Sequence, residues 1–210
     1  MYVGRIVAVG KTNGGYNSVL YRVSSRSFPN RQLVERNGVL VVEPREGFET
    51  DTSKNPYIAY NAIRLTESWA IASNGSHTDA IADRISEGMP VRQALALCLM
   101  AFDYEKDEYN TPRIVAVVPK EGESAWLGVI SPDSLEIKHI RLQPGKAIYL
   151  ATYLVNEILS SNISEFDASS AEEAAQWVID GGAFNSMEHP VTGGAALVGP
   201  SGFTLASQTI

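Results

Sequence analysis

The grouping of the expected helices and strands constrains the fold of this chain more than any other feature. Apolar segments of strand length fill residues 2–73 and 113–153, and two adjacent helical segments stand between these two runs. A third helical segment and a closing pair of strands follow. Strands grouped in this way, instead of alternating with helices, are typical of α+β proteins. The sequence therefore predicts an α+β fold built on antiparallel sheets.

The expected strands are short, and turns rich in Gly, Pro, Asn and acidic residues separate them. They cover residues 2–9, 18–24, 38–43, 61–65, 69–73, 113–118, 125–130, 135–141, 147–153, 195–198 and 203–206. Residues 11–16 (KTNGGY) carry turn chemistry, so the first two strands are expected to form a hairpin. The segment 150–158 fits a strand or a helix equally well by its periodicity.

Three helices are expected. The first covers residues 79–87, with Thr78 or Asp79 as its cap and Gly88 at its end. The second covers residues 91–102 and is apolar on nearly all sides, so it must be buried on more than one face. The third opens with a capping box formed by Ser170 and Glu173 and ends at residues 181–182. Together these elements predict a four-layer αββα sandwich, with the helices outside two antiparallel sheets.

Length and composition favour one domain spanning residues 1–210, because 44% hydrophobic residues suffice for one sizeable core. No apolar run approaches the roughly 18 residues of a membrane span, and the start lacks the pattern of a secretory leader. Cys98 is the single cysteine, which excludes a disulfide within the chain. It favours a reducing compartment, and a cytoplasmic protein is expected.

The charge is unevenly distributed. The net charge is -7, yet residues 1–42 hold six Lys and Arg residues against the single acid Glu35. An acidic protein is a poor candidate for non-specific binding to nucleic acid. A local concentration of arginine suits a small anionic ligand better, although solvated surface arginines are the alternative explanation.

Four polar segments stand beside the expected strands, where loops often carry function. They are residues 22–31 (RVSSRSFPNR), 55–61 (NPYIAYN), 73–79 (SNGSHTD) and 103–113 (DYEKDEYNTPR). Each segment also has a purely structural explanation, because Asn-Pro and Asn-Gly are turn sequences and Ser, Thr and Asp cap helices.

Taken together, these segments resemble the archaeal-type IMP cyclohydrolases. The opening YVGRIVAVG, the segment 172–184 (EEAAQWVIDGGAF) and residues 189–192 (HPVT) are similar to that family too. The resemblance runs from residue 1 to about 118 and more thinly afterwards, and residues 143–170 and the last dozen match no pattern. It implies an αββα fold like that of the N-terminal nucleophile hydrolases. It also implies cofactor-free ring closure of 5-formamidoimidazole-4-carboxamide ribonucleotide (FAICAR) to IMP, the last step of purine biosynthesis.

N-terminal nucleophile hydrolases use a Ser, Thr or Cys at the mature N-terminus, activated by its own amine. Here Met1 is followed by Tyr2, and no compelling internal processing site is visible. Different chemistry is therefore expected on this fold. Two alternatives stay open: an amidohydrolase of the N-terminal nucleophile class, and a purine-nucleotide-binding module without catalysis.

The resemblance marks Arg31, Tyr60 and Glu105 as catalytic. We hypothesise that Arg31 stabilises charge on the formyl oxygen, that Tyr60 donates a hydrogen bond or a proton to that oxygen, and that Glu105 orients or deprotonates the carboxamide. The structural alternatives are a surface ion pair for Arg31, a core aromatic for Tyr60 and a solvated acid for Glu105.

Substrate binding is expected from polar side chains of the same segments. The candidates are Arg22, Ser24, Ser25, Arg26 and Lys106 for the phosphate, and Asn74, Ser76, His77 and Asp107 for the ribose or carboxamide. No metal or cofactor is expected, because the three histidines are widely spaced and no phosphate-loop or dinucleotide motif is present. The expected partner is the purine nucleotide alone, without nucleic acid or membrane, and the sequence leaves a homo-oligomer open.

Overall fold

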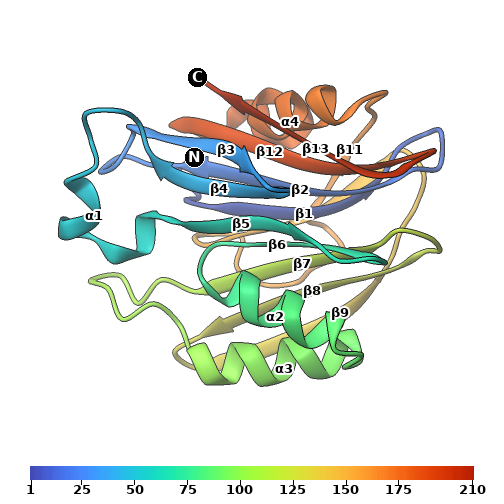
Figure 1. Cartoon of the computed structure of the whole chain (residues 1–210), viewed down its shortest axis with the longest axis horizontal. Helices are drawn as coiled ribbons and strands as arrows, with labels where there is room; N and C mark the ends of the chain where they lie inside the picture. The colour runs from blue at the N-terminus through green and yellow to red at the C-terminus, as the bar shows by residue number, and fades with distance from the viewer.

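Two antiparallel sheets packed face to face form the centre of the computed structural model, which describes residues 1–210 apart from the side chains of Lys54 and Pro56 (Figure 1). The six-stranded sheet has the order β11 (Ile163–Glu165), β10 (Lys146–Ala151), β1 (Ile6–Lys11), β2 (Asn17–Ser24), β12 (Pro190–Gly199) and β13 (Gly202–Thr209). The seven-stranded sheet follows chain order with β3 (Arg31–Arg36), β4 (Val39–Pro44), β5 (Tyr60–Leu65), β6 (Trp69–Ser73), β7 (Arg113–Pro119), β8 (Ser124–Ser131) and β9 (Ser134–Arg141).

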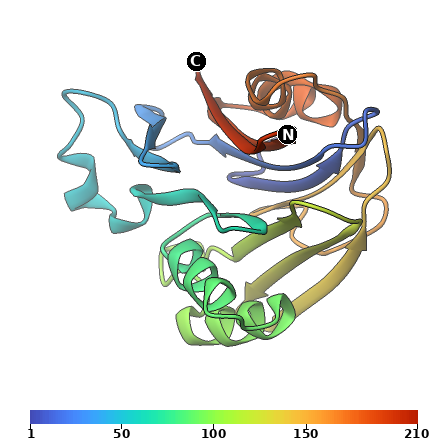
Figure 2. The same ribbon diagram turned by 45° about the vertical axis from the view of Figure 1, so that its right-hand side comes forward.

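Helices cover the outer faces of both sheets (Figures 1 and 2). The covering helices are α2 (His77–Ser86), α3 (Val91–Phe102) and α4 (Ala171–Asp180). The short helix α1 (Asp51–Lys54) lies at one end of the sandwich, and the chain also forms the short 3-10 turns η1 (Pro56–Ile58) and η2 (Gly182–Ser186). Figure 2 shows α4 on the six-stranded sheet and the pair α2 and α3 on the seven-stranded sheet. The layers therefore run helix, sheet, sheet, helix. None of the helices in the described residues has both the length and the apolar character that a membrane crossing requires.

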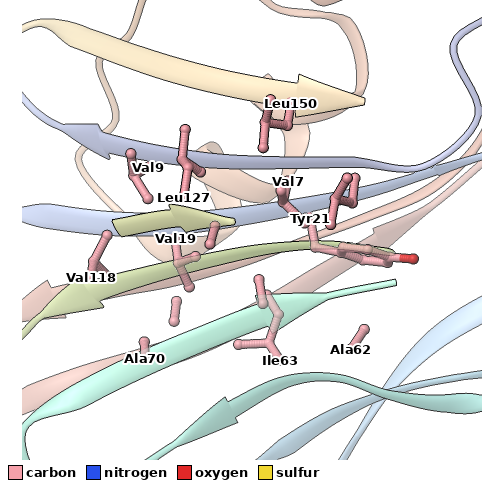
Figure 3. Packing of buried hydrophobic residues seen from close by; sticks show 14 of the residues in the cluster. Val7, Val9, Val19, Tyr21, Ala62, Ile63, Ala70, Val118, Leu127 and Leu150 are labelled. Carbon is pink, nitrogen blue, oxygen red and sulfur yellow. The ribbon is translucent and has the colours of Figure 1, made fainter. Parts of the chain in front are cut away.

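The main core lies between the two sheets. Figure 3 shows Val7 and Val19 of the six-stranded sheet near Ile63 and Ala70 of the seven-stranded sheet, and all four side chains are fully buried. Side chains alternate between the two faces of a strand. Strands such as β1 are apolar on both faces because one face meets the other sheet and the opposite face meets α4.

Two adjacent glycines let β12 pack closely against both neighbouring layers. A Cβ atom on Gly193 would lie 2.8 Å from the carbonyl oxygen of Ala175 in α4. A Cβ atom on Gly194 would lie 2.7 Å from Leu40 Cδ1 of the opposite sheet. At Gly193 the near atom is backbone, so this position requires a residue without a side chain, whereas at Gly194 the near atom is the far end of a leucine side chain, which can shift more easily.

The α+β class, the order of the elements and the bounds of α3 confirm the sequence prediction. Helix α2 corrects it, because Ser76 is the N-cap instead of Thr78 or Asp79. Strand β1 begins at Ile6 instead of residue 2, and the ambiguous segment 150–158 only completes β10 before it becomes irregular. Strand β3 was missed because this edge strand is rich in charged residues.

Candidate active site

Polar side chains from both sheets gather at one end of the sandwich. Figure 1 shows α1 and the loop after α3 at this end. Strands β3, β5 and β7 begin at this end, and β2 and β6 finish there. Hydrogen bonds, ion pairs and electrostatic contacts link six of these side chains. They form what we call the end cluster: Arg5, Tyr21, Arg31, Tyr60, Glu105 and Arg113.

Glu105 is the acid of the end cluster and is only 1% exposed. Its carboxylate accepts a hydrogen bond from Arg5 Nη2 at 2.7 Å, and Arg113 Nη1 lies 3.9 Å away. Asn74 Nδ2 donates to the same carboxylate at 3.4 Å. Burial raises the pKa of Glu105, against the opposing effect of Arg5 and Arg113. A buried carboxylate with a raised pKa is a stronger base than one in water.

The loop that carries Glu105 is fixed by its own polar groups. Asn110 adopts a positive φ angle of 48°, which Asn tolerates better than most residues, and Asp103 has φ 54° with ψ -177°, outside the left-handed helical region. Asp107 accepts hydrogen bonds from the Thr111 backbone N–H at 2.9 Å and the Thr111 hydroxyl at 2.7 Å. Asp107, expected to bind substrate, is therefore occupied in holding the loop.

Tyr60 and Arg31 occupy the first positions of β5 and β3. The Tyr60 hydroxyl makes a short hydrogen bond with the Tyr21 hydroxyl of β2. Arg31 is 2% exposed, and its Nε donates to the carbonyl oxygen of Phe28 at 3.1 Å. Burial lowers the pKa of Arg31, and the nearby Tyr60 hydroxyl opposes that effect. Both side chains face the interior, which contradicts the surface ion pair considered for Arg31.

Arg5 links Glu105 to Tyr60 within the end cluster. Burial lowers the pKa of its guanidinium, but the Glu105 carboxylate and the Tyr60 hydroxyl more than reverse this, so the pKa lies above its ordinary value. Arg31 also interacts electrostatically with Tyr60 and Arg5. Arg31, Tyr60 and Glu105, which come from three distant segments of the chain, are thus brought into one cluster.

Asn74, which follows β6, and His77, at the start of α2, both contact the backbone at the start of β7. Asn74 Oδ1 accepts from the Ile114 backbone N–H at 2.8 Å, and Asn74 Nδ2 donates to the Pro112 carbonyl oxygen at 3.0 Å. His77 is fully buried, with Nε2 3.3 Å from the Ile114 carbonyl oxygen. Burial and the neighbouring Arg113 lower the pKa of His77 to about 3, so its imidazole is neutral near pH 7.

Four buried nitrogen atoms in this region have no hydrogen-bond partner among the described protein atoms. They are Arg5 Nε, Arg31 Nη1, His77 Nδ1 and Arg113 Nη1. Buried polar groups are almost always satisfied, so such a concentration of unpaired groups needs an explanation. Three of the four are guanidinium nitrogens, which donate and cannot accept. The end cluster therefore suits a ligand that carries several acceptor oxygens or nitrogens.

Arg22 and Ser24, expected at the phosphate, lie elsewhere. Arg22 is fully buried in the layer between β2 and α4, on the opposite face of β2 from Tyr21. Its guanidinium donates to Ser24 Oγ at 3.0 Å and to the carbonyl oxygens of Ile179, Phe184 and Met187. Burial lowers its pKa to about 10, so it stays charged at neutral pH. These contacts are structural, and the structure does not bring either residue to the end cluster.

The remaining predicted residues lie in turns and at the surface. Ser25 Oγ accepts from the Phe28 backbone N–H at 3.0 Å in the turn before β3. Arg26 is exposed, pairs with Glu188, and lies 4.3 Å from the centre of the Tyr2 ring. Lys106 is exposed and pairs with Asp103. Ser76 is exposed at the start of α2.

Sequence reasoning missed three members of the end cluster. Arg5 carried a signal, because it is a charged residue inside an otherwise apolar strand segment. Arg113 closes the fourth polar segment and was counted only as the start of a strand. Tyr21 gave no signal, since an aromatic residue within an apolar strand is normally core.

No group of three or more His, Cys, Asp or Glu side chains that could hold a metal ion occurs among the described residues. Cys98 is buried in α3. Burial raises the pKa of its thiol, which agrees with a packing residue more than with a nucleophile.

A buried carboxylate between two guanidinium groups, beside a pair of tyrosine hydroxyls, is an arrangement typical of an enzyme that binds a polar anionic substrate. The family model described as IMP cyclohydrolase-like protein matches residues 2–199. The chain belongs to the IMP cyclohydrolase-like family. The match includes residues 143–170, where the sequence pattern alone gave no resemblance.

Several archaeal proteins named IMP cyclohydrolase are similar to this chain. One from Methanococcus maripaludis strain C6 is 45% identical over 209 residues, covering 99% of this chain and 100% of that protein. One from Methanosphaera stadtmanae is 42% identical over 196 residues, covering 93% and 94% of the two chains. One from Methanocaldococcus jannaschii is 37% identical over 210 residues, covering 99% of each.

Proposed function

We propose that this chain converts FAICAR to IMP and that Arg31, Tyr60 and Glu105 carry the reaction. Family membership supports the reaction. The observation that carries the residue assignment is the meeting of these three side chains in one buried cluster, although they stand 29 and 45 positions apart in the sequence. Such a meeting is what an intramolecular condensation needs, because it must hold two arms of one molecule together.

Ring closure begins when the carboxamide nitrogen attacks the formyl carbon. The Glu105 carboxylate takes a proton from that nitrogen, and the Tyr60 hydroxyl gives its proton to the formyl oxygen. Arg31 lies beside Tyr60 and stabilises the negative charge that develops on the oxygen. The product of this step is a cyclic carbinolamine, with Glu105 protonated and Tyr60 as phenolate.

Loss of water completes the ring. Glu105 returns its proton to the departing hydroxyl, which leaves as water. The proton on the former formamido nitrogen passes to the Tyr60 phenolate, and the electron pair of that N–H bond forms the new C=N bond. Both residues regain their starting states, so the cycle needs no co-reactant.

The site also has to hold the phosphate and ribose of the substrate. The unpaired nitrogens of Arg5, Arg113 and His77 support contacts to the substrate within the end cluster. Among the residues expected at the phosphate, Arg26 and Lys106 keep exposed cationic groups near the same end. The binding roles of Ser25, Asn74, Ser76 and Asp107 stay proposals that accompany this assignment.

We further infer that the two-sheet sandwich is the fold of the N-terminal nucleophile hydrolases, used without a terminal nucleophile. The helix, sheet, sheet, helix layers support this inference. In this protein the proton carriers come from strand starts and a loop, not from a free N-terminal residue. A cytoplasmic location is likewise proposed, in keeping with the lone buried thiol of Cys98.

The test is an absorbance assay for ring closure with the purified chain and FAICAR, without added metal or cofactor. Arg31→Ala, Tyr60→Phe and Glu105→Gln should each lower kcat by about 100-fold or more, while calorimetry still detects IMP binding. Arg141→Ala, on exposed β9, is the control and should match the unmodified chain.

Three results would overturn the proposal. Absence of IMP with the unmodified chain would reject the reaction, and IMP binding without turnover would favour the non-catalytic module. A shortened chain in mass spectrometry of the active protein would favour the amidohydrolase. Full turnover in the three variants would reject the residue assignment.

A further inference from the structure

The Tyr21–Tyr60 contact crosses the interface between the two sheets. Tyr21 belongs to β2 and Tyr60 to β5, and their hydroxyl groups are hydrogen-bonded to each other. Their rings meet edge to face, with centroids 6.4 Å apart and planes at 85°. Figure 3 shows the Tyr21 hydroxyl at the margin of the aliphatic cluster, past the side chains of Val7 and Val19. Packing on both rings thus fixes the position of this hydroxyl pair.

The burial of the two hydroxyl groups bears on which of them donates in their hydrogen bond. Tyr21 is fully buried, and its hydroxyl has one hydrogen-bond partner among the described residues, Tyr60. Either hydroxyl can be the donor in this contact, and Tyr21 is the more deeply buried of the two, since Tyr60 is 8% exposed. If Tyr21 donates to the Tyr60 oxygen, the Tyr60 proton is left free for a substrate oxygen.

We propose that Tyr21 is a positioning residue that aims the Tyr60 proton at the substrate and stabilises the Tyr60 phenolate once that proton has left. This inference rests on the proposed function, in which Tyr60 is the proton donor. In the resting site the Tyr21 hydroxyl donates to a neutral oxygen. After proton transfer it donates to an anion, and hydrogen bonds to ionised acceptors are roughly twice as strong. The contact thus stabilises the reacting state more than the resting state.

The charged groups around Tyr21 and Tyr60 also favour Tyr60 as the proton donor and Tyr21 as its positioning partner. Arg5 precedes β1 and Arg31 opens β3, and both interact electrostatically with the two tyrosines. Arg113 on β7 also interacts with Tyr60. Glu105 faces Arg5 and Arg113 in the same cluster. Burial raises the pKa of Tyr21 well above its ordinary value of 10.0, and Tyr60 raises it further, against the opposing effect of Arg5 and Arg31.

Tyr21→Phe tests the inference because it removes the hydroxyl and keeps the ring that packs in the core. We expect kcat to fall by about 10- to 100-fold with KM changed less than about twofold. The basic limb of the kcat–pH profile should move to higher pH, because the Tyr60 phenolate loses a stabilising hydrogen bond. Tyr149→Phe is the control, since that ring packs against Phe184 on the α4 side of the same sheet and should leave both quantities unchanged.

A fluorotyrosine at position 21 tests the same contact with the hydroxyl kept. Fluorine makes the phenol a stronger donor, so the basic limb should move to lower pH, opposite to the Tyr21→Phe shift. A purely structural role for Tyr21 would change the melting temperature without moving either limb. Unchanged kcat and an unmoved limb in both variants would overturn the inference. Failure of the proposed function would give a different result from failure of this inference. In that case the unmodified chain would form no IMP, or Tyr60→Phe would keep full turnover.

Discussion

At the scale of single residues, buried arginines fall into two groups that the sequence does not distinguish. Arg22 donates to three backbone carbonyl oxygens and a serine hydroxyl, so its hydrogen-bonding capacity is used within the protein. Arg5, Arg31 and Arg113 face the carboxylate and tyrosines of the end cluster, and each keeps a buried nitrogen without a hydrogen-bond partner among the described protein atoms. The first pattern is that of a structural residue, and the second suits a ligand.

Arg22→Met tests the structural role. The substitution leaves the carbonyl oxygens of Ile179 and Met187 without the guanidinium donor, while Phe184 keeps the Met187 backbone N–H, so the free energy of unfolding should fall by about 3 kcal/mol. KM should stay within about twofold of the unmodified value at temperatures where the variant is folded. Urea unfolding measures the first quantity, and Arg36→Met, on an exposed ion pair, should change it by less than about 1 kcal/mol. A large rise in KM would instead indicate that Arg22 contributes to substrate binding.

Glu105 should set the acidic limb of the activity profile. Burial raises its pKa above the ordinary value of 4.5, and its carboxylate must be ionised to accept the carboxamide proton. As the pH falls, kcat/KM should therefore decline with a midpoint above 4.5. The measurement is kcat/KM across the acidic range. In Glu105→Gln the residual activity should lack this limb, and a limb that persists there would belong to another group.

His77 should make stability depend on pH. Its pKa is lowered from 6.5 to about 3, so below 6.5 the unfolded chain binds a proton that the folded chain does not. Stability is therefore complete above about pH 6.5 and falls, by up to about 1.4 kcal/mol per pH unit, as the pH drops toward 3. Urea unfolding between pH 7.5 and 4.5 should show a smaller decline for His77→Gln than for the exposed control His189→Gln. Equal declines would contradict the assignment.

At the scale of elements, two helix starts show how capping can be recognised in sequence. Ser170 adopts an extended backbone, and its hydroxyl accepts from the Glu173 backbone N–H at 3.2 Å, as the capping box predicts. The Glu173 carboxylate departs from that motif, because it accepts from the Ser169 backbone N–H at 2.8 Å. Ser76 has helical backbone angles and makes no side-chain cap contact. The same residue type thus stabilises one helix start and not the other.

Ser170→Ala and Ser76→Ala form a matched pair. Loss of the Ser170 cap should lower the free energy of unfolding by about 1 kcal/mol, because one N-terminal N–H of α4 loses its acceptor. Ser76→Ala should change it by less than about 0.5 kcal/mol. Chemical denaturation of both variants at one pH gives the comparison. Equal effects would mean that the two serines act in the same way.

The elements that the sequence predicted well are those whose pattern is local. Helix α3 was found with its bounds because its apolar run begins after a proline and ends at a change in composition. Strand β3 was missed because Gln32, Glu35 and Arg36 obscure the alternation of buried Leu33 with half-buried neighbours. The sequence did not indicate where Arg22 packs, because its hydrogen-bond partners lie more than 150 residues away and only the fold brings them together.

At the scale of the whole molecule, the close packing of the six-stranded sheet against α4 and against the opposite sheet depends on β12. Gly193 faces α4 and Gly194 faces the opposite sheet, so successive residues of one strand contact two different layers. This arrangement lies outside what periodicity can predict, because a glycine in a strand indicates only that some neighbour approaches closely.

Gly193→Ala should lower the free energy of unfolding by about 1 to 3 kcal/mol, because its Cβ would meet the backbone of Ala175, which cannot rotate away. Gly199→Ala in the same strand is the control, since the nearest atom to its Cβ is 3.8 Å away. Thermal or urea unfolding of the two variants gives the difference. Equal stability would mean that α4 can shift outward without loss.

The pairing of β2 with β12 also sets an order of events during synthesis. Every member of the end cluster lies within residues 5–113, yet β2, which carries Tyr21, is flanked on one side by residues 190–199. A ribosome therefore produces all the side chains of the site long before it produces the strand that completes their support. Catalytic competence should appear only when translation has passed residue 199.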